Sequence, residues 1–76
     1  MTDVILTKQQ FATLAGGMYI ALERPDGSRW RLVHEDYVGG FDEDADWHIG
    51  VTAQEIGDMA GFGFVSGGVT FLADSR

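Results

Sequence analysis

The chain has 76 residues, no cysteine and a formal net charge of −7, from twelve acidic and five basic residues. The lack of cysteine excludes a disulfide framework and a thiolate metal site, and a hydrophobic content of 45% argues against intrinsic disorder. No stretch approaches the ~18 apolar residues of a membrane span, and the first residues lack the pattern of a signal peptide. We therefore expect one small soluble domain in the cytoplasm.

The first predicted element is a short helix over residues 7–16. Thr7 is a good N-cap, and Gln10 three residues later completes a capping box. Leu14 lies on the apolar face, and Gly16 supplies a residue type that commonly ends helices. Because so short a helix is marginal in water, packing against the rest of the chain must hold it.

Residues 18–35 are predicted to form a β-hairpin. Its turn is the Arg-Pro-Asp-Gly sequence at residues 24–27, where proline presets φ and glycine accepts a positive φ. A three-residue loop at this turn pairs Leu22 with Trp30 and gives the hairpin one apolar face for the core. The opposite face, which carries Arg31, has both polar and apolar residues, and we expect it to be exposed to solvent.

Residues 36–50 are predicted to form a long loop, with at most a short extended piece near Trp47. The stretch 35–48 holds six of the twelve acidic residues and no basic residue. Crowded like charges cost folding stability, so we expect the stretch to serve a function. Its acidic residues are Glu35, Asp36, Asp42, Glu43, Asp44 and Asp46.

A second helix is predicted over residues 52–61 and a second hairpin, or two short strands, over residues 62–73. Thr52 and Glu55 form the capping box of this helix. The sequence therefore predicts an α+β fold, with a small antiparallel β-sheet of two hairpins packed with two short α-helices. The two helix entries overlay at an offset of 45 residues. Either a duplication or independent use of the same capping rules would explain this similarity.

A calcium site is one interpretation of the acidic stretch. Asp42, Asp44 and Asp46 fall at the first, third and fifth positions of an EF-hand loop. The pattern then fails, because Trp47 replaces the required glycine and Ala53 stands where the bidentate glutamate belongs. A weak cation site of another kind stays open as a lesser alternative.

We expect no enzyme active site and no cofactor. The chain offers no cysteine nucleophile, and its serines lie in turn or terminal contexts. His34 ends the apolar face of the first hairpin, so a structural role is expected for it. His48 lies beside the acids, where a solvated loop histidine is the default and a pH switch the alternative.

The remaining interpretation is recognition of a basic partner. Residues 32–75 carry nine acidic residues and no lysine or arginine, which excludes nucleic-acid binding through a basic patch. Duplex DNA carries one charge per ~1.7 Å of axis, so dense carboxylates could imitate it. The alternative is an acidic loop that only improves solubility. The predicted partner-binding residues are Glu35, Asp36, Asp42, Glu43, Asp44, Asp46, Glu55 and Asp58, with Tyr37, Phe41 and Trp47 as apolar anchors.

In size, acidity, lack of cysteine and small α+β build, the chain resembles the small anti-CRISPR proteins of bacteriophages and mobile elements. Several of these proteins mimic DNA and block the target-recognition subunits of a CRISPR surveillance complex. The resemblance concerns the character of the whole chain and no shared motif, so it assigns no functional residue. It implies a bacterial host cytoplasm and a CRISPR-Cas effector subunit as the basic, nucleic-acid-binding partner.

An alternative function is that of a small phage or bacterial structural adaptor. Residues 61–71 would then offer an exposed hydrophobic strand edge, with Phe62 and Phe64 as its contacts. In either case we expect a monomer or a weak homodimer that binds neither nucleic acid nor membrane directly.

Overall fold

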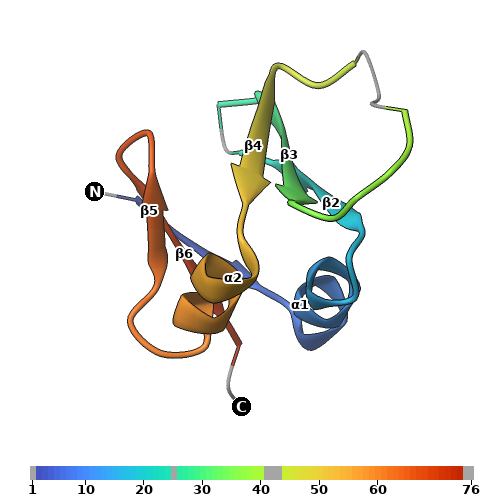
Figure 1. Cartoon of the computed structure of the whole chain (residues 1–76). Coiled ribbons are helices and arrows are strands. Elements are labelled where there is room, and N and C mark those ends of the chain that lie inside the picture. Colours follow the sequence, from blue (N-terminus) through green and yellow to red (C-terminus); the bar gives the residue numbers. More distant parts are fainter. Residues whose placement is uncertain (1, 25, 41–43, 75–76) are drawn as a thin grey trace.

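The fold belongs to the α+β class, as the sequence predicts (Figure 1). A computed structural model describes residues 2–24, 26–40 and 44–74. Neither helix within these ranges has the length and apolar character of a membrane-spanning segment. The elements are β1 (Thr2–Leu6), α1 (Lys8–Ala15), β2 (Tyr19–Glu23), β3 (Arg29–His34), β4 (Trp47–Val51), α2 (Ala53–Met59), β5 (Phe64–Ser66) and β6 (Val69–Ala73).

The strands form two three-stranded sheets, which we call sheet A (order β1-β6-β5) and sheet B (order β2-β3-β4). Both predicted hairpins are present, and each has gained a third strand that runs parallel to its neighbour. The sheets are therefore mixed rather than purely antiparallel. β4 also shortens the predicted loop over residues 36–50, since a full strand begins at Trp47. Parallel pairing needs a distant partner strand, and no local turn signals it.

The chain repeats one order of elements, strand-helix-hairpin, in residues 2–34 and 47–73. The first strand of each half pairs with the hairpin of the other half and not with its own. β1 therefore pairs with β6, and β4 pairs with β3. β1 and β4 begin and end 45 residues apart, which is the offset of the helix similarity. The match in order, offset and strand exchange favours duplication over independent use of capping rules.

Both capping boxes are confirmed. The Thr7 hydroxyl accepts the Gln10 N–H at 3.1 Å, and the Gln10 side chain accepts the Thr7 N–H at 2.9 Å. Thr52 and Glu55 repeat this exchange at 3.1 and 2.9 Å. The first hairpin also has its predicted register, with Leu22 opposite Trp30.

One hydrophobic core joins the two sheets and both helices. α1 packs mainly on β2 and β3, whereas α2 packs on β5 and β6. The rings of Trp30 from sheet B and Phe71 from sheet A meet across the core, with centroids 6.0 Å apart. Since each large buried side chain contributes about 1.5–3 kcal/mol, this shared core stabilises both halves at once. Its buried members are Leu6, Leu14, Ile20, Trp30, Leu32, Val51, Ile56, Met59, Val69 and Phe71.

The outer face of sheet B, which points away from the core, is less exposed to solvent than predicted. Arg31 is only 9% exposed and Val33 only 7%. The described parts of the connection from β3 to β4, residues 35–40 and 44–46, run beside this sheet (Figure 1), and the ring of Tyr37 packs edge-on against Tyr19 at 5.2 Å. The expectation failed because a long connection between parallel strands returns past the sheet and covers it.

Candidate functional site

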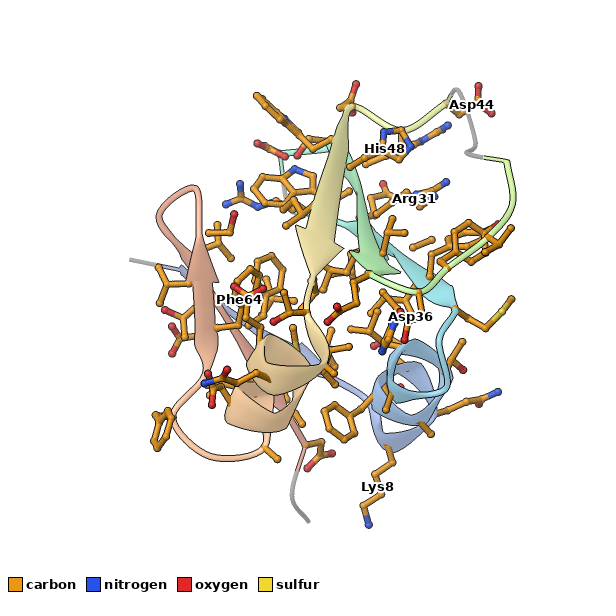
Figure 2. All side chains as sticks on the ribbon, viewed as in Figure 1. Lys8, Arg31, Asp36, Asp44, His48 and Phe64 are labelled. Carbon is orange, nitrogen blue, oxygen red and sulfur yellow. The ribbon has the colours of Figure 1, made fainter. Side chains whose placement is uncertain are left out.

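The candidate site comprises the described residues 35–40 and 44–46 between β3 and β4, which we call the acidic loop, together with the start of α2. Figure 2 shows Asp44 at the same end of the molecule as Arg31 and His48, while Asp36 lies lower, beside α1. His48 stands opposite Arg31 in the parallel pairing of β3 and β4, so both belong to the outer face of sheet B. Asp36 and Asp44 are exposed, and Arg31 is buried.

At the start of β4, Asp46 is held by the backbone of β3. Its Oδ2 accepts the Arg29 N–H at 2.7 Å, and its own N–H donates to the Arg29 carbonyl at 2.8 Å. In the adjoining turn, the Asp26 carboxylate accepts the N–H and the hydroxyl of Ser28 at 2.9 and 2.6 Å. These hydrogen bonds from Ser28 lower the pKa of Asp26. Both acids are therefore fixed beside the tip of the first hairpin.

At the other end of sheet B, two carboxylates meet the start of α2. Glu35 Oε2 accepts the Ala53 N–H at 2.6 Å, and Glu55 Oε1 accepts the Thr52 N–H at 2.9 Å. The first N–H groups of a helix have no partner within the helix and carry partial positive charge. Glu35 and Glu55 satisfy two such donors, and the exposed Asp36 follows directly in the chain.

The predicted acids thus form two groups and not one continuous face. The strand-start group contains Asp44 and Asp46, and the helix-start group contains Glu35, Asp36 and Glu55. β4 separates them and has five residues. Asp46 precedes β4 and Thr52 follows it, so at about 3.3 Å per residue the two groups lie roughly 20 Å apart along the strand. Among the other predicted residues, Asp58 lies half-buried in the last turn of α2, and Asp42 and Glu43 lie outside the described residues.

Asp26, which is not among the predicted partner-binding residues, joins the strand-start group. Asp26 and Asp46 accept the N–H groups of successive residues, Ser28 and Arg29. The Asp-Gly-Ser sequence at residues 26–28 is typical of a turn in which an aspartate bonds the backbone two residues ahead. The local sequence therefore indicates the turn itself, but it does not indicate that the turn lies beside Asp46.

The predicted aromatic anchors do not share a surface. Tyr37 is half-buried on the outer face of sheet B, and its hydroxyl donates to the Gly40 carbonyl at 3.0 Å. Trp47 pairs with Trp30 on the opposite, core-facing side of the sheet and stays 60% exposed. Tyr37 therefore stabilises the acidic loop, whereas Trp47 belongs to another site. Phe41 lies outside the described residues.

The histidines differ in their surroundings. His34 is 7% exposed, and its Nδ1 accepts the Asp36 N–H at 2.9 Å, which suits the structural role predicted for it. His48 is exposed and lies in β4 rather than in a loop. Across the described ranges, no three histidine, aspartate or glutamate side chains come together to hold a metal ion. The EF-hand pattern includes Asp42, which lies outside those ranges.

Large exposed apolar side chains occur away from the acidic loop as well. Phe62 is 84% exposed in the connection from α2 to β5. On the outer face of sheet A, Ile5 is 64% and Val65 62% exposed. Phe64, by contrast, is partly buried and packs on Phe71 with centroids 6.1 Å apart. Of the two contacts predicted for an adaptor, only Phe62 is thus exposed.

Comparison of the chain with models of protein families, with curated proteins and with solved structures finds no match. A functional assignment must therefore come from the chain itself. The strongest features are the two acidic groups of sheet B and the exposed aromatic and apolar side chains.

Proposed function

We propose that the chain is a non-enzymatic inhibitor that occupies the DNA-binding groove of a CRISPR-Cas surveillance complex in place of DNA. The observation that carries the proposal is the pair of acidic groups at the ends of sheet B, whose members other than Asp26 lie in a stretch with no lysine or arginine from residue 32 to residue 75. The resemblance in character to anti-CRISPR proteins gives the proposal its CRISPR partner. The charge pattern supports the wider class, a binder of basic protein surfaces.

The fixed position of the carboxylates suits such binding. Asp46, Glu35 and Glu55 each accept a backbone N–H, so their side chains lose little conformational freedom when a partner docks. An exposed carboxylate still has a second oxygen for an arginine or lysine of the partner. A pre-organised set of charges is therefore a better imitation of a nucleic-acid backbone than a flexible acidic tail.

The fold also limits the cost of gathering these acids. The buried Arg31 beneath the acidic loop offsets part of the repulsion among the acids without presenting its charge at the surface. The outer surface can thus remain acidic at a lower cost to folding.

A phage plaque assay tests the proposal. Bacterial strains with active CRISPR systems of different types would express the chain, and a targeted phage would be plated on each. We expect plaques to be restored in at least one strain. Asp44→Lys should abolish this rescue because it reverses a charge in the strand-start group. Asp3→Lys changes the net charge equally on the exposed surface of β1 and should leave the rescue intact.

The assay can also contradict the proposal. Failure to rescue in every strain, despite soluble expression, would remove the CRISPR partner. Equal loss of rescue in Asp44→Lys and Asp3→Lys would show that net charge, and not the acidic groups, matters. Thermal unfolding of both variants is needed to show that they are folded.

A second candidate function is that of an adaptor that docks through apolar side chains, and the 84% exposure of Phe62 favours it. Such binding would depend little on salt, because apolar contacts are not screened. Phe62→Ser should then abolish partner binding, whereas Asp44→Lys should not. The opposite pattern would exclude the adaptor.

A further inference from the structure

A cleft of about 420 Å³ lies where the tips of the two hairpins meet the start of β4. Its volume falls within the range of about 300–1,000 Å³ that is typical of small-molecule sites. Its lining comes from three strands and two turns: Arg24, Trp30, Trp47, Ile49, Ser66 and Gly67. None of these side chains belongs to the two acidic groups, so the cleft is a separate site.

Two tryptophans give the cleft its aromatic wall. Trp30 and Trp47 stand opposite each other in the parallel pairing of β3 and β4, with ring centroids 6.2 Å apart and planes tilted by 50°. Trp30 is buried, whereas Trp47 is 60% exposed and offers its ring to a ligand. Ile49, two residues further along β4, extends the same apolar face.

The turn of the second hairpin closes the cleft beside Trp30. Gly67 has a φ of +57°, which favours glycine, and a Cβ at this position would lie 3.5 Å from Trp30 Cη2. The turn therefore packs directly against the indole ring. The indole N–H of Trp30 already donates to the Ser28 hydroxyl at 3.1 Å. Trp30 thus contributes an apolar ring surface, and a polar ligand group must find its partner elsewhere.

Arg24 supplies that partner. Its guanidinium lies over the Trp30 ring, 4.8 Å from the centroid, in a cation–π arrangement. Its Nε is buried and has no hydrogen-bond partner among the residues that the structure describes. A buried donor without an acceptor is unfavourable, so the arrangement is suited to a ligand that brings one. The planar guanidinium is well matched to a carboxylate or a phosphate.

We propose that this cleft binds a small planar aromatic molecule that carries an anionic group. The aromatic ring packs on Trp47 and Ile49, and the carboxylate or phosphate bonds to Arg24. Both a nucleoside monophosphate and an aromatic carboxylic acid have this chemistry. The proposal does not rest on the inhibitor function, because it uses different residues and a cation instead of carboxylates.

Nuclear magnetic resonance provides a direct test, because the chain contains only the two tryptophans that line the cleft. Their two indole N–H signals would be followed while adenosine monophosphate or benzoate is added, with adenosine and benzamide as neutral analogues. We expect saturable shifts of both signals and at least about tenfold tighter binding of the anions, a difference that reflects the charge contact with Arg24. Binding of only one anion would support the site and identify which anionic group it prefers.

Matched variants make the result specific to Arg24. Arg24→Gln should remove the preference for the anion, and Arg24→Lys should keep part of it because the charge remains. Lys8→Gln removes the same charge from α1 and should bind like the unaltered chain (Figure 2). The proposal is overturned if no probe gives saturable shifts at millimolar concentration. Equal binding of charged and neutral probes, or an unchanged preference in a folded Arg24→Gln variant, would also overturn it.

Discussion

The outer faces of the two sheets differ in how far they are covered. On the central strand of sheet B, Val33 is 7% exposed and Arg31 9%, whereas Thr70 and Leu72 on the central strand of sheet A are only half-buried. The difference arises after the last strand of each hairpin. β3 continues into the acidic loop, which packs Tyr37 against Tyr19. Within the described ranges, no comparable segment covers sheet A.

The acidic loop accounts for two features of sheet B. It buries the outer face of that sheet, and it places acidic residues at both ends of the sheet. α2 starts with the carboxylates of Glu35 and Glu55, whereas the first turn of α1 contains no acid. The two halves therefore share a scaffold but differ in the charge at the start of their helices.

The largest predicted effect tests whether the two sheets share one core. Phe71→Ala in sheet A and Leu32→Ala in sheet B remove side chains that are 1% and 0% exposed. We expect each to lower the free energy of unfolding by about 3–5 kcal/mol, a large part of the stability of so small a domain. Chemical denaturation followed by circular dichroism and tryptophan fluorescence should show both signals changing together. A variant that loses one sheet and keeps the other would contradict the shared core.

A smaller effect is predicted when alanine replaces the glycines that precede β2 and β5, and the loss of stability should differ between the two positions. Gly17 and Gly63 have φ values of +92° and +97°, but only at Gly63 would a Cβ clash, 2.8 Å from Thr70 Cγ2. Gly17→Ala should cost about 1–2 kcal/mol for the positive φ. Gly63→Ala should cost about 1–3 kcal/mol more, because Thr70 must move. Equal losses of stability in thermal unfolding would show that sheet A relaxes around the added methyl group.

The next effect concerns the acids of the helix-start group. Glu35→Ala removes the acceptor of the Ala53 N–H and should destabilise the fold by about 1–2 kcal/mol. Asp36→Ala is the matched control, since its side chain is 81% exposed and lies 3.9 Å from His34 Nδ1. It should cost less than about 0.5 kcal/mol. If denaturation shows equal costs, the hydrogen bond to α2 does not stabilise the fold.

The smallest predicted effect is a difference between the two hairpin turns in their protection from amide exchange at acid pH. Hydrogen bonds from Ser28 hold the pKa of Asp26 below its ordinary value of 3.8. The stabilisation they give is therefore present above the ordinary value and is lost as the pH falls through the lower pKa of the folded state. Amide exchange at Ser28 should rise in this acid range before that at Val69, whose turn contains no acid. Simultaneous loss of protection in both hairpins would indicate global unfolding instead.

Local signals in the sequence predicted the local structure well. The capping boxes at Thr7 and Thr52 and the register of Leu22 opposite Trp30 depend on residues that are near in the chain. β1 and β4 were missed as sheet strands because their partners are distant and parallel. Burial of Arg31 was missed for the same reason, since it depends on where the acidic loop returns.

The candidate site was predictable in composition but not in arrangement. The density of acids is visible in the sequence, yet the division into two groups follows from the position of β4. The separation of Tyr37 from Trp47 onto opposite faces of sheet B depends on the register of the parallel strands. The cleft beside Trp47 could not be anticipated, because its lining comes from both halves of the chain.

The central claim is that the two acidic groups of sheet B bind a basic groove, and a direct binding measurement tests it best. A purified CRISPR surveillance complex inhibited in the plaque assay would be titrated with the unaltered chain, Asp44→Lys and Asp3→Lys. We predict that Asp44→Lys weakens binding at least about tenfold, or about 1.4 kcal/mol, and that Asp3→Lys has little effect. Binding should also weaken steeply between about 0.1 M and 1 M salt, as the screening length falls from about 10 Å to about 3 Å. Equal affinities of the two variants, or binding that is insensitive to salt, would contradict the claim.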